Sequence, residues 1–431
     1  MENSNLFIQV LKEGVQPATG CTEPVAVAFA TATAMDYLES KVISKIFVEV
    51  SANIMKNAMA VIVPGTNRPG LQVAAAAGAI VGDSSAGLKV ISGVNASNLS
   101  TICSLADSGK IDIKVADVED DLYVKVTIMS EKNTVSVWVA GNHTNVFKIE
   151  KNNKIIKNNL KPMPHAISET NTLLQQCTLR EIWDFALLEP LENITFMLEA
   201  RKLNMALSAE GLSKCYGLGL GRSINDAKRL KLGSEIESDL CNKLIAYTAA
   251  ASDARMGGAQ LPAMSNSGSG NQGITATVPV CVIAKEFECS DEKLIRALTL
   301  SHLTALYIHA FLPVLSAFCA ANSAAMGAAV AICYLMGKNY EEAAYSINNM
   351  ISDASGMICD GAGCSCAMKV ATSVSSMYRA INLVLQGIVV PESNGLVFDC
   401  IEETIKALGK LVTNGFKETD EVILNTMLEK S

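Results

Sequence analysis

The sequence predicts an α+β protein, in which a mixed α/β N-terminal portion packs on a mainly helical C-terminal portion. Between residues 41 and 151, β-branched residues alternate with polar ones in several segments, a pattern typical of strands. From about Asn171 onward, Ala, Leu and Met recur at helical spacing. A polar, Pro-containing stretch at 151–166 separates the two patterns, so we assign residues 1–165 to the first portion and 166–431 to the second.

The N-terminal portion is expected to begin with a loop that carries Gly20 and Cys21. A helix should follow from Pro24, because proline suits the first helical turn, where its missing N–H has no partner. The Ala-rich run at 74–83 predicts one more helix. The segments that predict strands are KVISKIFVEVSA (41–52), IDIKVADV (111–118), DLYVKVTIM (121–129) and TVSVWVAG (134–141).

The C-terminal portion is expected to consist of helices interrupted by Gly-rich or small-residue loops at 217–221, 256–273 and 355–366. Within it, the apolar stretch 303–336 is long enough to cross a bilayer. The stretch contains polar residues such as His309 and lacks both an aromatic belt and flanking Lys or Arg. We therefore interpret it as buried core helix and expect no contact with a membrane.

Composition narrows the class of protein. The 431 residues are 49% hydrophobic and 18% charged, which indicates an ordered protein with ample material for a core. Because 35 Lys and Arg stand against 43 Asp and Glu without a long basic run, nucleic acid is not an expected partner. The first residues do not resemble a secretory signal, so we expect a cytoplasmic protein. In that reducing compartment, 13 Cys indicate metal binding or thiol chemistry rather than disulfides.

Four cysteines of the C-terminal portion are candidate metal ligands. Cys319 lies in LSAFCAANSAA, and Cys359, Cys364 and Cys366 lie in the Gly- and Ser-rich segment SGMICDGAGCSCAMKV. Thiolates suit iron because sulfur is a soft ligand, and backbone N–H groups of a Gly-rich loop can hydrogen-bond to cluster sulfur. The spacing matches neither ferredoxin runs nor paired CxxC zinc sites. From the residues alone, an iron–sulfur site and packing as small buried hydrophobes both remain open.

Cys21 is a candidate nucleophile or base. It lies in TGCTEP, directly before the predicted helix, where the positive end of the helix dipole favours a thiolate and lowers the thiol pKa. The alternative is a structural turn in which Cys21 packs and Thr22 caps the helix.

The segment SNSGSGNQG at 265–273 is a candidate binding loop. Its glycines allow close backbone approach, and successive N–H groups can form a concavity that binds a carboxylate or phosphate. It lacks the Lys of a P-loop and the order of GxGxxG, so a nucleotide is not favoured, and a flexible polar loop is the alternative. The candidate substrate-binding residues are Ser265, Asn266, Ser267, Ser269 and Asn271.

Other polar residues give weaker signals. Asp253 and Arg255 in SDARMGG are interpreted as an ion pair. The four His lack metal-binding spacing, and His302 and His309 are expected to be ordinary core or surface residues. No Lys motif for a pyridoxal phosphate Schiff base is present.

Taken together, the motifs resemble a known family. The blocks TGCTEPVAVAFA, KNAMAVIVPGT, SDARMGG, SNSGSGNQGITATVPV, LSAFCAANSAA and SGMICDGAGCSCAMKV resemble the iron–sulfur L-cysteine desulfidases, which are related to the iron–sulfur L-serine dehydratases. The resemblance implies a [4Fe–4S] cluster held by Cys319, Cys359 and Cys366, and it makes Cys21 the base that takes the substrate's α-proton. Cys364 competes with Cys366 for the third ligand position, and Cys366 fits the family spacing better.

The implied reaction is a β-elimination without pyridoxal phosphate that converts L-cysteine to sulfide, ammonia and pyruvate. The alternatives are an iron–sulfur L-serine dehydratase and a non-catalytic relative that binds a cluster or an amino acid. Gly363 stands where the family pattern has Lys, which makes the non-catalytic alternative plausible. No Cys follows Cys400, whereas some related serine dehydratases place a C-terminal Cys at the cluster, and this difference favours the desulfidase. The expected partner is a small amino-acid substrate, and a homo-oligomer is compatible with the sequence.

Overall fold

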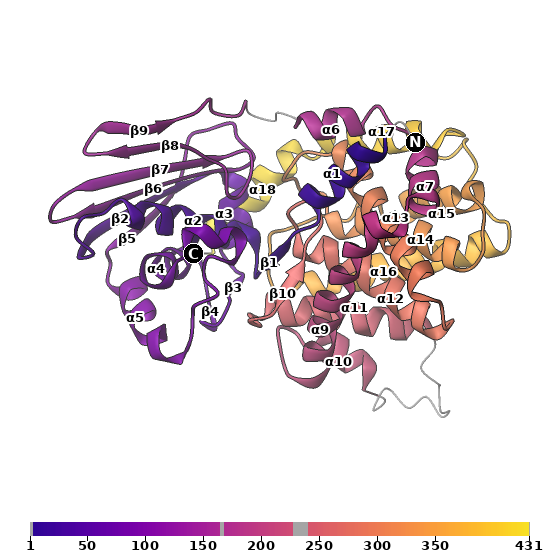
Figure 1. The fold of residues 1–431 in the computed structure, drawn as a ribbon, viewed down its shortest axis with the longest axis horizontal. Helices are drawn as coiled ribbons and strands as arrows, with labels where there is room; N and C mark the ends of the chain where they lie inside the picture. Colours follow the sequence, from indigo (N-terminus) through magenta and orange to yellow (C-terminus); the bar gives the residue numbers. More distant parts are fainter. Residues whose placement is uncertain (1–2, 164–167, 227–239, 431) are drawn as a thin grey trace.

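The computed structural model describes residues 3–163, 168–226 and 240–430. Figure 1 shows a portion built on a β-sheet beside a larger portion built from helices. The predicted α+β class is therefore confirmed. The predicted boundary between residues 165 and 166 lies outside the described residues and stays a prediction.

Six strands form one mixed sheet in the order β5-β2-β6-β7-β8-β9, in which only β2 and β5 run parallel. Alternation places Ile46, Val48 and Val50 in the core and leaves Phe47 on the opposite face. All four predicted strands are present. The prediction missed β8. It also missed β9, whose exposed residues give no apolar alternation, and it treated that segment as boundary. The strands are β2 (Ile43–Val50), β5 (Ile111–Val115), β6 (Tyr123–Ser130), β7 (Thr134–Ala140), β8 (Val146–Lys151) and β9 (Lys154–Asn158).

Helices cover the apolar face of this sheet. The helix α2 is buried on nearly every side because it lies against both the sheet and α4, which explains why its sequence is apolar all round. It begins at Thr22 rather than Pro24, with Cys21 as its N-cap. The prediction included α2 and α4 but missed the two other α-helices. The helices of this portion are α2 (Thr22–Asp36), α3 (Ala52–Ala58), α4 (Leu71–Val81), the 3₁₀ helix η1 (Ser84–Lys89) and α5 (Ala96–Asp107).

The helical portion packs around one large hydrophobic core. The apolar stretch 303–336 contains the end of α13, a loop and α14, and these helices approach closely because Gly327 leaves space against the Ser301 carbonyl. No helix in the described ranges is long and apolar enough to span a bilayer. Its helices are α6 (Glu169–Leu174), α7 (Leu179–Leu188), α8 (Leu191–Ile194), the 3₁₀ helix η2 (Thr195–Met197), α9 (Leu198–Ser213), α10 (Leu220–Asn225), α11 (Leu240–Met256), α12 (Gly270–Glu286), α13 (Asp291–Ala310), α14 (Ala320–Leu335), α15 (Tyr340–Ala354), α16 (Cys366–Leu385) and α17 (Ile401–Gly415).

The two ends of the chain cross between the portions. The first helix, α1 (Ser4–Gly14), packs in the helical core, where the rings of Phe7 and Phe185 lie 5.2 Å apart. The last helix, α18 (Lys417–Leu428), packs on α3, and Leu424 joins the core beneath the sheet. Each portion therefore depends on a terminal helix from the other end of the sequence.

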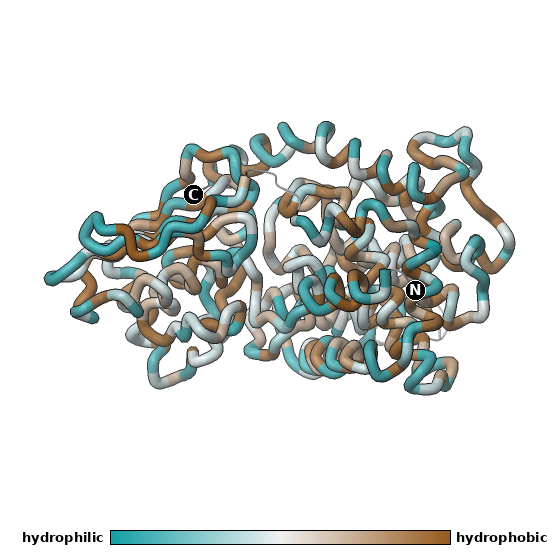
Figure 2. The backbone as a smooth tube through the Cα atoms, turned by 45° about the horizontal axis from the view of Figure 1, so that its top comes forward, coloured by the Kyte–Doolittle hydropathy of each residue, from teal (hydrophilic) through white to brown (hydrophobic). Residues whose placement is uncertain are grey.

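Figure 2 shows polar and apolar residues interspersed along the chain in both portions.

Two short ladders join segments that lie near the junction of the portions. The strand β1 (Pro17–Thr19), which precedes Cys21, pairs antiparallel with β10 (Pro262–Met264). The strand β3 (Ile62–Val63) pairs with β4 (Arg68–Pro69). The first ladder holds the N-terminal segment beside the start of the loop at 265–273, although the two are distant in sequence.

Candidate active site

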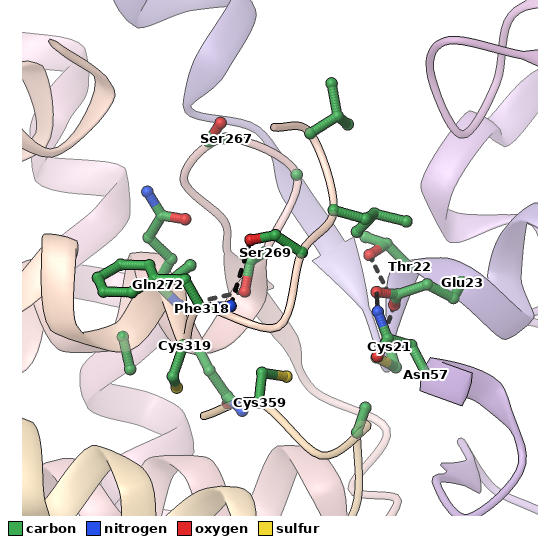
Figure 3. Close-up of a pocket in the computed structure, with 18 of the residues that line it drawn as sticks. Cys21, Thr22, Glu23, Asn57, Ser267, Ser269, Gln272, Phe318, Cys319 and Cys359 are labelled. Atoms are coloured by element: carbon green, nitrogen blue, oxygen red, sulfur yellow. Dashed lines mark hydrogen bonds between the residues drawn. The ribbon is translucent and has the colours of Figure 1, made fainter. Parts of the chain in front are cut away.

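A cavity of about 110 Å³ lies between the two portions. Cys21, Glu23 and Asn57 of the N-terminal portion form one part of its wall, and Figure 3 shows them across from Ser269 and Cys319 of the helical portion. Small cavities at the junction of two structural units are common ligand sites. This cavity is the natural candidate for an active site because nearly all the chemistry-bearing motifs of the sequence meet there.

Four helix N-termini meet at the cavity. Cys21, Ser269 and Cys319 are the N-caps of α2, α12 and α14, and Cys366 is the first residue of α16. Each helix has at least 15 residues. Because each begins at the cavity, the partial positive charge of its N-terminus lies at the cavity wall. The local field therefore favours anionic groups, such as thiolates bound to metal and a substrate carboxylate.

Three of the four candidate ligand cysteines line the cavity. Cys319 and Cys359 are brought side by side by an isolated β-bridge, in which the Cys359 N–H donates to the Ala317 carbonyl at 2.6 Å. Cys366 lies on the same wall at the start of α16. Cys364 does not line the cavity, which favours Cys366 as the third ligand.

The three thiols share an unusual electrostatic environment. Burial raises the pKa of Cys319 and of Cys359, and burial together with the neighbouring Cys359 raises the pKa of Cys366 to about 11. Without a metal they are therefore neutral thiols. Binding of a metal displaces such protons, because thiolate is the ligating form. Lys56 and Lys369 lie close enough to oppose these pKa rises, so each favours the thiolate form.

The donor set fits an iron–sulfur cluster. It consists of three thiols with hydrogen bonds from the backbone N–H groups of Ala321, Gly361 and Gly363, the arrangement expected around cluster sulfur. Gly363 contributes here through its main chain. Within the described residues no group of three His, Cys, Asp or Glu converges tightly enough for a single metal ion. Cys319, Cys359 and Cys366, which line one cavity, are the residues that would hold a cluster there.

Cys21 forms a buried pair with Glu23. The Cys21 Sγ–H donates to Glu23 Oε2 at 2.9 Å, and Thr22 Oγ1 donates to the same oxygen at 3.1 Å. Burial and then the Glu23 carboxylate raise the pKa of Cys21 well above its ordinary value, against a smaller opposite effect of Arg255. The sequence argument from the helix dipole predicted a lowered pKa and is wrong for this state, because burial outweighs the dipole. Glu23 was not singled out from the sequence, although it lies in the same TGCTEP motif.

The loop at 265–273 reaches the cavity with only some of its predicted residues. Ser267, Ser269 and Asn271 line it, as predicted for substrate-binding residues. Ser265 and Asn266 do not. The Ser265 hydroxyl instead donates to the Gln16 carbonyl at 2.6 Å and ties the loop to the N-terminal segment. Asn266 is fully buried and hydrogen-bonds within the helical core.

Asp253 and Arg255 do not form the predicted ion pair. The Gly-rich loop 217–221 wraps around Asp253, whose Oδ2 accepts the Gly221 N–H at 2.9 Å. This loop therefore binds a carboxylate of its own chain. Arg255 is buried, lines the cavity and donates from Nε to the Gly20 carbonyl at 3.1 Å. Within the described ranges Arg255 forms no ion pair, and its Nη1 donates to Met256 Sδ at 3.2 Å.

Two histidines also line the cavity and were not predicted to do so. His143 lies in the loop between β7 and β8, and His309 lies near the end of α13. Burial lowers the pKa of His143 and lowers that of His309 to about 4, so both are neutral at pH 7. No spacing pattern joins them, so only the fold could reveal them. His302 is a core residue, as expected, and its ring bonds to Asn266 and Thr277.

Comparisons with known proteins identify the class to which this fold and site belong. A family model described as serine dehydratase alpha chain matches residues 186–425, more than half of the chain. The chain is 61% identical over 427 residues to the UPF0597 protein of Latilactobacillus sakei, with 99% of each chain covered. It is 45% identical over 426 residues to the UPF0597 protein of Dichelobacter nodosus, with 98% and 97% covered. The chain therefore belongs to the family of iron–sulfur serine dehydratase-like proteins.

Proposed function

We propose that this protein is a β-eliminating lyase that acts on L-cysteine without pyridoxal phosphate and produces sulfide, ammonia and pyruvate. The observation that carries the proposal is the meeting of Cys21 with Cys319, Cys359 and Cys366 on the wall of one cavity. An elimination needs a base at the α-proton and an electrophile at the leaving sulfur, because neither bond breaks easily alone in water. The wall of this cavity provides residues for both tasks.

Cys319, Cys359 and Cys366 would hold the cluster that the family uses. When bound, a [4Fe–4S] cluster with an open iron supplies a Lewis acid for the leaving sulfur. The positive ends of α14 and α16 and the nearby Lys56 and Lys369 favour the negative charge of the thiolates. Because both lysines are anchored by Asp420 and Asp360, their charges hold fixed positions.

Cys21 acts as the base with the help of Glu23. The thiol proton passes from Cys21 Sγ to Glu23 Oε2 along their 2.9 Å hydrogen bond, and the resulting thiolate takes the proton from the substrate's Cα. The electron pair left at Cα forms the Cα=Cβ double bond, and the substrate's Cβ–Sγ bond breaks, which releases sulfide and leaves aminoacrylate. The aminoacrylate tautomerises and adds water, which yields pyruvate and ammonia. Arg255 lowers the pKa of Cys21, so it favours the thiolate during this transfer.

The cavity also orients the substrate. Arg255 and the positive end of α12 favour the substrate carboxylate, with Ser267, Ser269 and Asn271 beside it. Burial between the two portions excludes bulk water from the carbanion that forms at Cα.

The second candidate is an L-serine dehydratase, which the description of the matching family model favours. The test is to supply anaerobically reconstituted protein with L-cysteine or L-serine and to measure pyruvate and sulfide. We expect equal amounts of pyruvate and sulfide from L-cysteine and little pyruvate from L-serine. Pyruvate from L-serine alone would assign the dehydratase instead. Full iron loading without any turnover would assign a non-catalytic binding protein.

A further inference from the structure

Buried polar atoms without partners gather around the cavity. Among the described residues, four that line it carry such an atom: Asn57 Oδ1, His143 Nε2, Gln272 Oε1 and His309 Nδ1. Asn57, His143, Gln272 and His309 are each at least nine-tenths buried. Buried polar side-chain atoms are nearly always hydrogen-bonded, so a group of unpartnered ones around one cavity indicates a polar ligand. The mechanism proposed above assigns a role to none of the four.

The orientation of the Asn57 amide is fixed by its partner. Its Nδ2 donates to Glu23 Oε1 at 3.1 Å, and a carboxylate oxygen accepts hydrogen bonds. The reversed amide would place two acceptors against each other. Asn57 Oδ1 is therefore the free atom, and it lies beside the negative charge of Glu23.

The orientation of Gln272 is fixed through a relay. Asn266 Nδ2 donates to the His302 backbone carbonyl at 3.0 Å, which can only accept. Asn266 Oδ1 is therefore turned toward Gln272 and accepts from Gln272 Nε2 at 2.9 Å. All three residues are fully buried. The relay leaves Gln272 Oε1 as a fixed acceptor, and this explains why Asn266 is buried behind the loop instead of lining the cavity.

These two carbonyl oxygens define the chemistry of their ligand. An amide oxygen accepts hydrogen bonds and donates none, so the ligand must present donors. Glu23 adds negative charge beside Asn57, which favours a cation, whereas Arg255 supplies positive charge elsewhere in the wall. A zwitterionic amino acid meets both requirements, because its ammonium group has three donors and its carboxylate has only acceptors.

We propose that Asn57 Oδ1 and Gln272 Oε1 bind the α-ammonium group of the substrate and restrict the site to α-amino acids. This inference rests on the proposed function, because it takes an amino acid as the substrate. Asn57 comes from the sheet portion and Gln272 from the helical portion. The ammonium group therefore connects the two portions across the cavity and turns the α-hydrogen toward Cys21, which lies beside the Asn57–Glu23 pair.

The test uses two ligands that differ only in the ammonium group. L-Cysteine and 3-mercaptopropionate are titrated by anaerobic calorimetry into iron-loaded protein that carries Cys21→Ala, so that L-cysteine is not consumed. In this background, Gln272→Met and Asn57→Leu should each weaken L-cysteine binding by about 10- to 100-fold, as expected for a lost hydrogen bond to a charged group. Binding of 3-mercaptopropionate should change by less than about twofold, because it makes no ammonium contact. The matched control is Thr304→Val, which removes a buried unpartnered hydroxyl away from the cavity and should change neither affinity.

Equal loss of affinity for L-cysteine and for 3-mercaptopropionate would show that Asn57 and Gln272 have only a structural role, and it would overturn the inference. An undiminished preference for L-cysteine in both variants would overturn it too. Turnover by protein that retains Cys21 separates this result from the proposed function. If protein that retains Cys21 converts L-cysteine but the variants still prefer L-cysteine to 3-mercaptopropionate, only the assignment of the ammonium site fails. If the variants lose this preference but protein that retains Cys21 converts no amino acid, the ammonium site stands and the proposed lyase activity fails.

Discussion

The buried ion pair between Lys56 and Asp420 is the contact that mutation tests most clearly. The Lys56 ammonium pairs with Asp420 of α18 and donates to the Cys359 carbonyl at 3.3 Å. Its side chain is 1% exposed, whereas that of Asp420 is 17% exposed. The two partners therefore differ in their access to water. Removal of the Asp420 carboxylate leaves the Lys56 ammonium, which cannot reach solvent. Removal of the Lys56 ammonium leaves the Asp420 carboxylate, which can.

The expected costs follow from this asymmetry. Loss of one partner from a buried ion pair destabilises a protein by about 3–5 kcal/mol, because the remaining charge stays desolvated. We expect this range for Asp420→Asn. For Lys56→Met we expect about 1–2 kcal/mol, since the Asp420 carboxylate can reach water and mainly the hydrogen bonds are lost. The double variant Lys56→Met with Asp420→Leu should come close to the wild-type free energy of unfolding, because no charge remains buried.

Urea unfolding followed by circular dichroism measures the four free energies of the double-mutant cycle. The account predicts that Asp420→Asn costs more than Lys56→Met and that the double variant recovers most of the loss. The reverse order, or costs that simply add, would refute the argument from desolvation.

Three further predictions concern the site itself. Cys366→Ser should lower the iron content and visible absorbance of anaerobically reconstituted protein, whereas Cys364→Ser should retain both; the opposite pattern would exchange the ligand assignment. Burial lowers the pKa of His309 in the folded protein to about 4, so the unfolded chain protonates His309 at a higher pH than the folded protein does. The stability that neutral His309 contributes is therefore present above pH 6.5 and is lost as the pH falls toward 4. His309→Gln should reduce the slope of unfolding free energy against pH in this window by up to about 1.4 kcal/mol per pH unit, and an unchanged slope in urea titrations would contradict it. Gly268→Ala should weaken L-cysteine binding, because Gly268 has φ +78° and a Cβ there would lie 3.3 Å from His143 Cε1; unchanged calorimetric affinity would show that this contact is irrelevant to the site.

The sequence predicted those parts of the fold that depend on local pattern. The strands β2 and β5 to β7 were found because β-branched and polar residues alternate along them, whereas β8, which also has buried residues, was missed. The edge strand β9 was missed because it has no buried face, and its register comes from pairing with β8. The packing of α1 in the helical core also has no local signal, since it depends on the ladder between β1 and β10.

The candidate site shows the same division between local and long-range information. Cys21, Cys359 and Cys366 stood out because each lies in a motif with glycine or a helix start, which are local features. Asn57 and Gln272 did not, because ordinary amides gain meaning only from the orientation that Glu23 and Asn266 impose on them. The pKa of Cys21 was predicted in the wrong direction for a related reason: the helix dipole is visible in the sequence, but burial is not.

The central claim is that Cys21, Cys319, Cys359 and Cys366 form one elimination site. The most direct measurement compares wild-type protein with Cys21→Ala at equal iron content and follows pyruvate and sulfide released from L-cysteine under anaerobic conditions. The account predicts that wild type releases both products and that Cys21→Ala, with its iron and absorbance intact, releases neither above the uncatalysed rate. Turnover by Cys21→Ala at a rate near that of wild type would contradict the claim.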